Sequence, residues 1–117
     1  MRTIESDIQI NCVNWFRLQY PEQNYLIYAI PNGGNRNVKT ATWLKKEGVR
    51  AGMPDLVIHA KNKMFYVEMK APLGVLQLSQ KETHKILKNL CVNVYVCRSF
   101  DEFKEIVNDE IRPIKSY

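Results

Sequence analysis

Apolar residues recur along this chain of 117 residues with two different periods, which predict helices and strands in alternation. From Thr3 to Tyr20 the apolar positions are three and four residues apart, as on the buried face of an amphipathic helix. Two later segments begin with the spacing of a capping box, Ser79 with Glu82 and Ser99 with Glu102. In all, helices are predicted over residues 3–20, 37 or 38 to 47, 79 to about 90, and 100 to about 108.

Short runs of apolar, β-branched and aromatic residues predict four strands. The first covers residues 24–30 and the last covers 91–97, while two runs on either side of Asn62 predict a β-hairpin. The order of elements is therefore helix, strand, helix, two-stranded hairpin, helix, strand, helix. This order predicts an α/β sandwich around a mixed sheet of about four strands.

The hairpin carries an acidic residue at each end. Glu68 and Lys70 are two residues apart, so in a strand their side chains leave the same face. A two-residue turn brings Asp55 to that face as well. With Lys61-Asn62 as the turn, Asp55 lies opposite Glu68; with Asn62-Lys63 it lies opposite Lys70 and diagonal to Glu68, within about 8 Å. Both registers place two carboxylates and a lysine on one patch.

Two neighbouring carboxylates repel each other unless a cation neutralises them, and Mg²⁺ prefers such oxygen ligands. The adjacent Lys70 can orient an attacking water or stabilise developing negative charge. These parts fit phosphodiester hydrolysis best. Glu102 and Lys104 have the same spacing as Glu68 and Lys70, but they lie in a predicted helix, where residues two apart do not share a face.

Basic residues outnumber acidic ones by 17 to 12, and the resulting net charge of +5 favours a polyanionic partner. Residues 36–50 contain five basic side chains against the single acid Glu47, directly upstream of the acidic patch. This segment either grips a nucleic-acid backbone or forms a solvated helix face. The candidate nucleic-acid-binding residues are Arg36, Lys39, Lys45, Lys46 and Arg50.

The composition indicates one globular domain over residues 1–117, with 45% hydrophobic and 25% charged residues. Three cysteines without CxxC spacing indicate neither a disulfide framework nor a zinc site. No apolar run approaches the roughly 20 residues of a membrane span, and the first residues lack the apolar core of a signal peptide. The expected location is the cytoplasm, with no membrane partner.

Several further residues have two readings. Glu5 is either a first-turn residue favoured by the helix dipole or a third acid of the site. Gly33-Gly34 forms either a phosphate-binding loop or a plain turn. Trp43 either stacks on a base or is half-buried against the sheet. His59 and His84 are assigned to the core edge or surface rather than to a metal.

The motif Pro54-Asp55 followed by Glu68-Met69-Lys70 resembles the PD-(D/E)xK nuclease superfamily. The wider sequence resembles one branch of it, the VRR-NUC family of virus-type replication and repair nucleases. The chain departs from that family where its members often carry Leu-Ser-Pro shortly before a glutamine. The residues that carry the resemblance are Glu5, Pro31 to Gly34 with Arg36, Gly52 to Leu56, Glu68 to Lys70, Gly74, Gln80 and His84.

The resemblance implies a restriction-endonuclease-like α/β sandwich and a divalent-metal-dependent DNA endonuclease. Asp55 and Glu68 would hold Mg²⁺ or Mn²⁺ together with the main-chain carbonyl of Met69. Lys70 would assist the attacking water. Glu5 and Gln80 would complete the site, Gln80 as a first-turn helix residue.

The substrate and assembly expected from the resemblance are branched DNA and a homodimer. Single-domain members look like Holliday junction resolving enzymes of DNA repair, acting in a bacterial or phage-infected cytoplasm. A four-way junction has a two-fold symmetry that a homodimer would match. Two alternatives remain, a non-catalytic nucleic-acid-binding domain that keeps the nuclease fold and a small metal-dependent nucleotide hydrolase.

Overall fold

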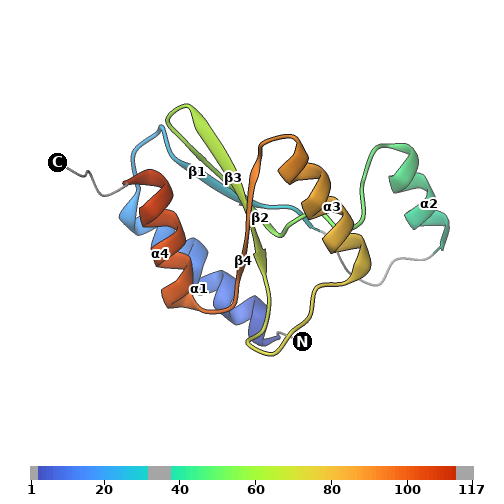
Figure 1. Cartoon of the computed structure of the whole chain (residues 1–117), viewed down its shortest axis with the longest axis horizontal. Coiled ribbons are helices and arrows are strands. Elements are labelled where there is room, and N and C mark those ends of the chain that lie inside the picture. Colours follow the sequence, from blue (N-terminus) through green and yellow to red (C-terminus); the bar gives the residue numbers. More distant parts are fainter. Residues whose placement is uncertain (1–2, 32–37, 113–117) are drawn as a thin grey trace.

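The computed structural model describes residues 3–31 and 38–112 (Figure 1). Its elements follow the predicted order, and the fold is α/β with a four-stranded mixed sheet flanked by helices, as the sequence predicts. The elements are α1 (Ile4–Gln19), β1 (Leu26–Ala29), α2 (Val38–Lys46), β2 (Leu56–Ala60), β3 (Lys63–Met69), α3 (Leu78–Asn89), β4 (Asn93–Cys97) and α4 (Phe100–Ile111).

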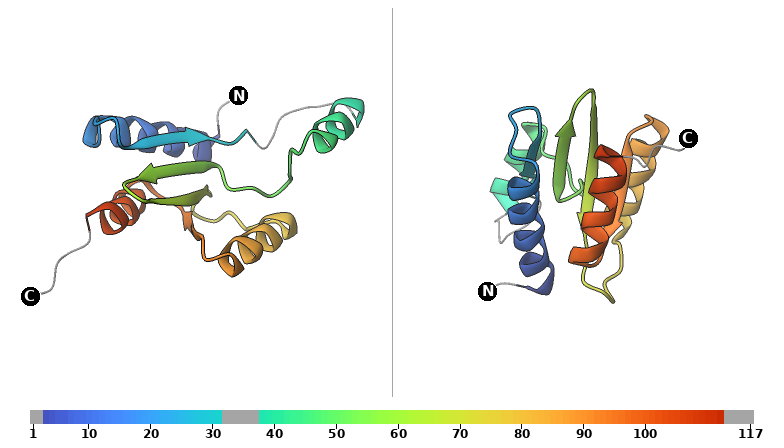
Figure 2. Two further views of the ribbon diagram at one scale, coloured as in Figure 1. Left: turned by 90° about the horizontal axis from the view of Figure 1, so that it is seen from above. Right: turned by 90° about the vertical axis from the view of Figure 1, so that its left-hand side faces the viewer.

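The strands lie side by side in the order β1-β2-β3-β4. β1, β2 and β3 pair antiparallel, whereas β3 and β4 pair parallel and are joined through α3. Seen from the left-hand side of Figure 1, α1 and α4 lie in front of the strands and α2 and α3 lie behind them (Figure 2). The two faces of β3 therefore meet different helices.

The side chains of β3 point alternately to the two faces of the sheet, so the two faces differ in character. Phe65, Val67 and Met69 are buried in one core with residues of α1 and α4, such as Phe16 and Phe103. The intervening residues of β3 point to the α3 side, because successive strand side chains leave opposite faces. The hydrophobic core thus holds the hairpin from one side and leaves the other side for polar residues.

Local signals account for where α1 and α4 begin. The Thr3 hydroxyl accepts a hydrogen bond from the Ser6 amide at 3.1 Å, and the Ser99 hydroxyl accepts one from the Glu102 amide at 3.1 Å. The predicted cap at Ser99 is therefore confirmed, and α4 runs three residues beyond its predicted end, to Ile111.

The predicted cap at Ser79 is wrong, because α3 begins two residues earlier with Gln77 as its N-cap. The Gln80 side-chain oxygen accepts a hydrogen bond from the Gln77 amide at 2.8 Å, so Gln80 makes the returning bond predicted for Glu82. Gln80 is still a first-turn residue, as expected.

The last strand is shorter than predicted. Cys91 has a φ of 63° and its amide donates to the Lys88 carbonyl at 2.9 Å, so it belongs to the turn that ends α3. The strand pairing begins only at Asn93. The first strand is likewise confined to Leu26–Ala29.

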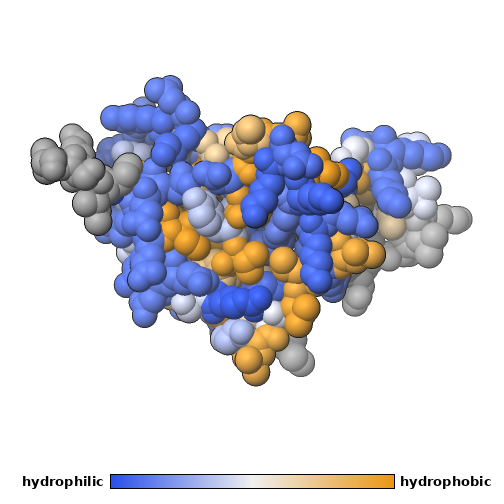
Figure 3. Space-filling view, viewed as in Figure 1, coloured by the Kyte–Doolittle hydropathy of each residue, from blue (hydrophilic) through white to orange (hydrophobic). Residues whose placement is uncertain are grey.

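Hydrophilic side chains cover much of the face seen in Figure 3, and an apolar area crosses its middle. The loop between β3 and α3, which forms the lowest point of this view, is also apolar. Within residues 3–31 and 38–112, no helix combines the length and the apolar character that a bilayer crossing requires.

Candidate active site

The hairpin adopts the first of the two predicted registers. Ala60 pairs with Lys63, which leaves Lys61 and Asn62 as the turn, and Asn62 has the left-handed φ of 58°. Leu56 pairs with Val67, so the preceding Asp55 stands opposite Glu68.

Asp55 accepts hydrogen bonds from main-chain amides on both sides of it. Its side-chain Oδ2 accepts a hydrogen bond from the Met69 amide at 2.7 Å, and its main-chain carbonyl accepts one from the Ile30 amide at 2.8 Å. The amide of Lys70, directly after β3, donates to the Cys97 carbonyl on the opposite edge, at 2.9 Å. Because the N–H and C=O of one strand residue point to the same edge, the Met69 carbonyl lies on the Asp55 side.

Glu68 is a buried carboxyl with only 1% of its surface exposed. Burial, a hydrogen bond with Asp55 and the negative charges of Asp55 and Glu5 raise the pKa of Glu68 to about 9, although the positive charge of Lys70 opposes the shift. Without a bound cation, Glu68 therefore keeps its proton at neutral pH.

Two residues of α3 contact Glu68. The Gln80 amide nitrogen donates to Glu68 Oε2 at 3.4 Å, and His84 Nε2 lies 3.1 Å from Glu68 Oε1. Burial first and the charge of Lys70 second lower the pKa of His84. The contact is therefore a hydrogen bond between a neutral imidazole and a carboxyl group rather than an ion pair.

His84 lies at the edge of the core, as predicted, but the sequence reading missed its contact with Glu68. The available signal was its spacing: it follows Gln80 by four residues and so shares that residue's helix face. His59, by contrast, contacts Tyr28, with the rings stacked 5.6 Å apart and the Tyr28 hydroxyl 3.1 Å from Nε2.

Lys70 and Glu5 both lie close to Glu68, beyond the end of β3. Lys70 is 8% exposed and its charge acts on both Glu68 and His84. Glu5, in the first turn of α1, accepts a hydrogen bond from the Ala71 amide at 3.3 Å. The fold thus gathers Glu5, Asp55, Glu68, Lys70 and Gln80, which the sequence named as site residues.

The donor atoms at this site fit a hard divalent cation. Within the described residues no three His, Cys, Asp or Glu side chains converge on one ion. Asp55, Glu68 and the Met69 carbonyl would supply three oxygens, and Mg²⁺ and Mn²⁺ accept water and phosphate oxygens at the remaining positions. Burial and the neighbouring Asp55 raise the pKa of Glu68, so a cation bound by these oxygens would favour its charged form.

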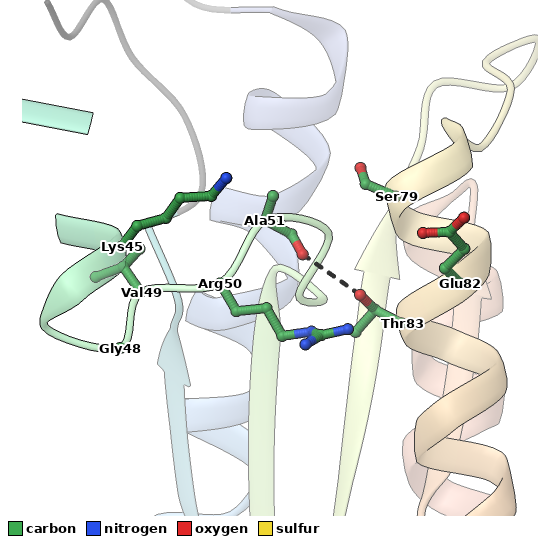
Figure 4. A pocket seen from close by; sticks show the side chains of 8 residues that line it. All are labelled: Lys45, Gly48, Val49, Arg50, Ala51, Ser79, Glu82 and Thr83. Atoms are coloured by element: carbon green, nitrogen blue, oxygen red, sulfur yellow. Dashed lines mark hydrogen bonds between the residues drawn. The ribbon is translucent and has the colours of Figure 1, made fainter. Parts of the chain in front are cut away.

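A pocket of about 490 Å³ opens between the segment after α2 and the α3 helix (Figure 4). Lys45 and Arg50 extend into it from one side, and the Thr83 hydroxyl closes one wall by donating to the Ala51 carbonyl at 3.3 Å. Two of the predicted nucleic-acid-binding side chains therefore face the same helix that supplies Gln80. The lining residues are Lys45, Gly48, Val49, Arg50, Ala51, Ser79, Glu82 and Thr83.

The remaining basic candidates have mixed outcomes. Lys46 places its amine 5.7 Å from the centre of the Trp43 ring. Trp43 is 64% exposed, so the reading that it half-buries against the sheet is wrong, and stacking on a base stays a prediction. Arg36, the Gly33-Gly34 loop and the side chain of Lys39 lie outside the described residues.

Comparison with known proteins gives one family. The sequence model described as the VRR-NUC domain matches residues 2–101, which contain all five site residues. A solved structure described as a VRR_NUC domain protein is similar with a TM-score of 0.71 and 20% identity, over 98% of this chain and 93% of that chain. No curated protein matches the sequence.

Proposed function

The chain belongs to the VRR-NUC domain family, whose domains are generally nucleases, and we propose that it is a divalent-metal-dependent endonuclease that hydrolyses phosphodiester bonds in DNA. The observation that carries the proposal is the pairing of Asp55 with the buried Glu68 beside Lys70. Two carboxylates held together at the end of a hairpin, with a raised pKa on one of them, are suited to a cation rather than to a proton.

Asp55, Glu68 and the Met69 carbonyl would hold Mg²⁺ or Mn²⁺. A bound ion of this kind polarises the phosphoryl oxygen and lowers the pKa of coordinated water. Lys70 donates from its buried position to the attacking water and stabilises charge that develops on the phosphate. Gln80 and His84 hold the two oxygens of Glu68, and Glu5 fixes the main chain directly after Lys70.

DNA is the proposed substrate because cationic side chains lie beside the acidic site. Lys45 and Arg50 line the pocket next to α3, and the chain carries a net charge of +5. The proposed substrate is branched DNA such as a four-way junction, and the proposed enzyme is a homodimer. The two-fold symmetry of the homodimer would match the two-fold symmetry of the junction.

The test is cleavage of a labelled synthetic four-way junction and of its linear arms with Mg²⁺ or Mn²⁺. Asp55→Ala and Lys70→Ala should each reduce the cleavage rate by at least about 100-fold, while Glu105→Ala on the exposed surface of α4 serves as the matched control. Equal cutting by all variants would refute the assignment of the site. Salt-sensitive binding without any metal-dependent cutting would instead favour a non-catalytic binding domain.

A further inference from the structure

Apolar side chains are exposed on the loop directly after the site. We call residues 71–77 the site loop; it joins β3 to α3. Leu73 is 95% exposed and Val75 is 73% exposed, and Leu78 at the start of α3 is 71% exposed. The apolar colour of this projecting loop is visible in Figure 3. Exposed single apolar residues are ordinary, but two on this loop and a third directly after it, all close to the proposed catalytic lysine, call for a binding partner.

The site loop is held rigidly. The Gly74 amide donates to the Ala71 carbonyl at 2.9 Å, which closes a turn with Pro72 and Leu73 at its two central positions. One guanidinium nitrogen of Arg98, Nη1, donates to the carbonyls of Ala71 at 3.0 Å and Gly74 at 2.6 Å. Leu73 therefore stands at the tip of a braced turn, and little conformational entropy is lost when that tip binds.

The tip also lies within reach of the DNA that the site would hold. Leu73 follows Lys70 by three residues, so its Cα is at most about 10 Å from that of Lys70. The Ala71 amide at the base of the turn is bound by Glu5, another residue of the site. A phosphate placed at Lys70 would thus bring its neighbouring nucleotides to Leu73.

We propose that Leu73 is a wedge that inserts between adjacent bases of the DNA bound at the active site. This inference rests on the proposed nuclease function. Basic residues and a metal bind the phosphate backbone, whereas the face of a base is apolar and accepts an aliphatic side chain. Insertion at the cut site would unstack a base step and favour substrates that unstack easily, such as a branch point.

A second copy of the chain is a poorer occupant of this surface. A stable dimer interface buries about 800 Å² on each partner and uses roughly 20–30 residues a side. Leu73, Val75 and Leu78 are three side chains, and the first projects alone from a turn. A projecting single side chain suits insertion better than it suits a flat interface.

The experiment places 2-aminopurine, which becomes brighter when unstacked, at successive nucleotides around the branch point of a four-way junction. The protein carries Lys70→Ala so that the junction is bound without being cut. We expect binding to raise the fluorescence at one or two positions at least twofold. Adding Leu73→Ser should abolish that rise and weaken junction binding by about 10-fold, whereas Leu18→Ser, an exposed leucine of α1, should change neither.

Two further measurements separate the outcomes. Unfolding midpoints should be equal for the Leu73 and Leu18 variants, because both side chains are exposed. Sedimentation velocity should give one oligomeric state for both. An unchanged fluorescence rise with Leu73→Ser overturns the wedge, as does loss of a dimer in that variant alone. If Asp55→Ala still abolishes cutting, the nuclease function survives such a result; if wild type cuts nothing, the proposed function itself fails.

Discussion

Replacement of Glu68 by Gln should stabilise the metal-free protein at neutral pH. Glu68 is 1% exposed and its pKa is raised to about 9 from an ordinary value of 4.5, with burial as the largest cause. Between these two pH values the folded protein keeps a proton that the unfolded chain releases. Stability therefore falls as the pH rises through this window. Glutamine resembles the protonated carboxyl in shape and does not titrate.

The size of the effect follows from the pKa difference. A pH of 7 is about 2.5 units above the pKa of Glu68 in the unfolded chain, and each unit corresponds to about 1.36 kcal/mol. Glu68→Gln should therefore raise the free energy of unfolding by about 3 kcal/mol at pH 7, and by less than about 1 kcal/mol at pH 5. Three kcal/mol is a large share of the roughly 5–15 kcal/mol that stabilises a domain.

Urea unfolding in the presence of a chelator measures the difference at pH 5, 7 and 8.5. Glu105→Gln, on the exposed surface of α4, is the matched control and should show no such trend. Millimolar Mg²⁺ should recover most of the deficit in the wild-type protein and little in the Glu68 variant. An advantage of equal size at pH 5 and 8.5 would mean that packing, and not a buried charge, is responsible.

Two more substitutions test how the site is held in place. His84→Leu should weaken Mn²⁺ binding by about 10- to 100-fold in a calorimetric titration, because Glu68 loses the group that orients it. His84→Gln should retain most of the affinity. Equal affinity in all three proteins would exclude the role of His84 in orienting Glu68. Gly52→Ala should lower the melting temperature by at least about 8 °C, because φ is 83° and the new Cβ would lie 2.3 Å from the Ser79 carbonyl oxygen. Gly48→Ala is its control, since φ is 105° but no atom lies within 4 Å of a Cβ there; equal losses in both would show that backbone strain, and not the contact with α3, is responsible.

The hairpin was predictable because its information is local. A period of two fixes which side chains share a face, and any two-residue turn brings Asp55 to the face of Glu68 and Lys70. The choice between the two registers was not predictable, since Asn62 suits either turn. The structure selects the turn in which Asn62 is the second residue, with its φ of 58°.

The start of α3 was mispredicted because the capping signal was read from the commonest residue types. Serine is a preferred N-cap, and Ser79 stands three residues before Glu82. In the structure the Gln80 side chain instead accepts the hydrogen bond from the Gln77 amide, and glutamine is not among the residue types preferred at an N-cap. The approach of Gly52 to Ser79 adds a tertiary constraint on this turn, which a single sequence does not reveal.

Contacts between distant segments explain why the burial of the site was out of reach of the sequence. Glu5 and Ala71 are 66 residues apart in sequence and are brought together by the packing of α1 under the sheet. Glu68 is enclosed by α3. The sequence pattern predicts where this helix stands along the chain but not how closely it covers Glu68. Its exposure of 1% is what separates a surface carboxylate from one with a pKa near 9.

That burial links stability to the proposed activity. A carboxyl that folding holds in its protonated form is also one that is stabilised when a divalent cation takes the proton's place. Lys70 alone does not supply enough positive charge, since the pKa of Glu68 stays high beside it. The fold therefore carries a deficit at Glu68 that metal binding would relieve, and ligand binding stabilises the folded state in proportion to that relief. An arrangement that served packing alone would place an apolar residue or a glutamine at this position.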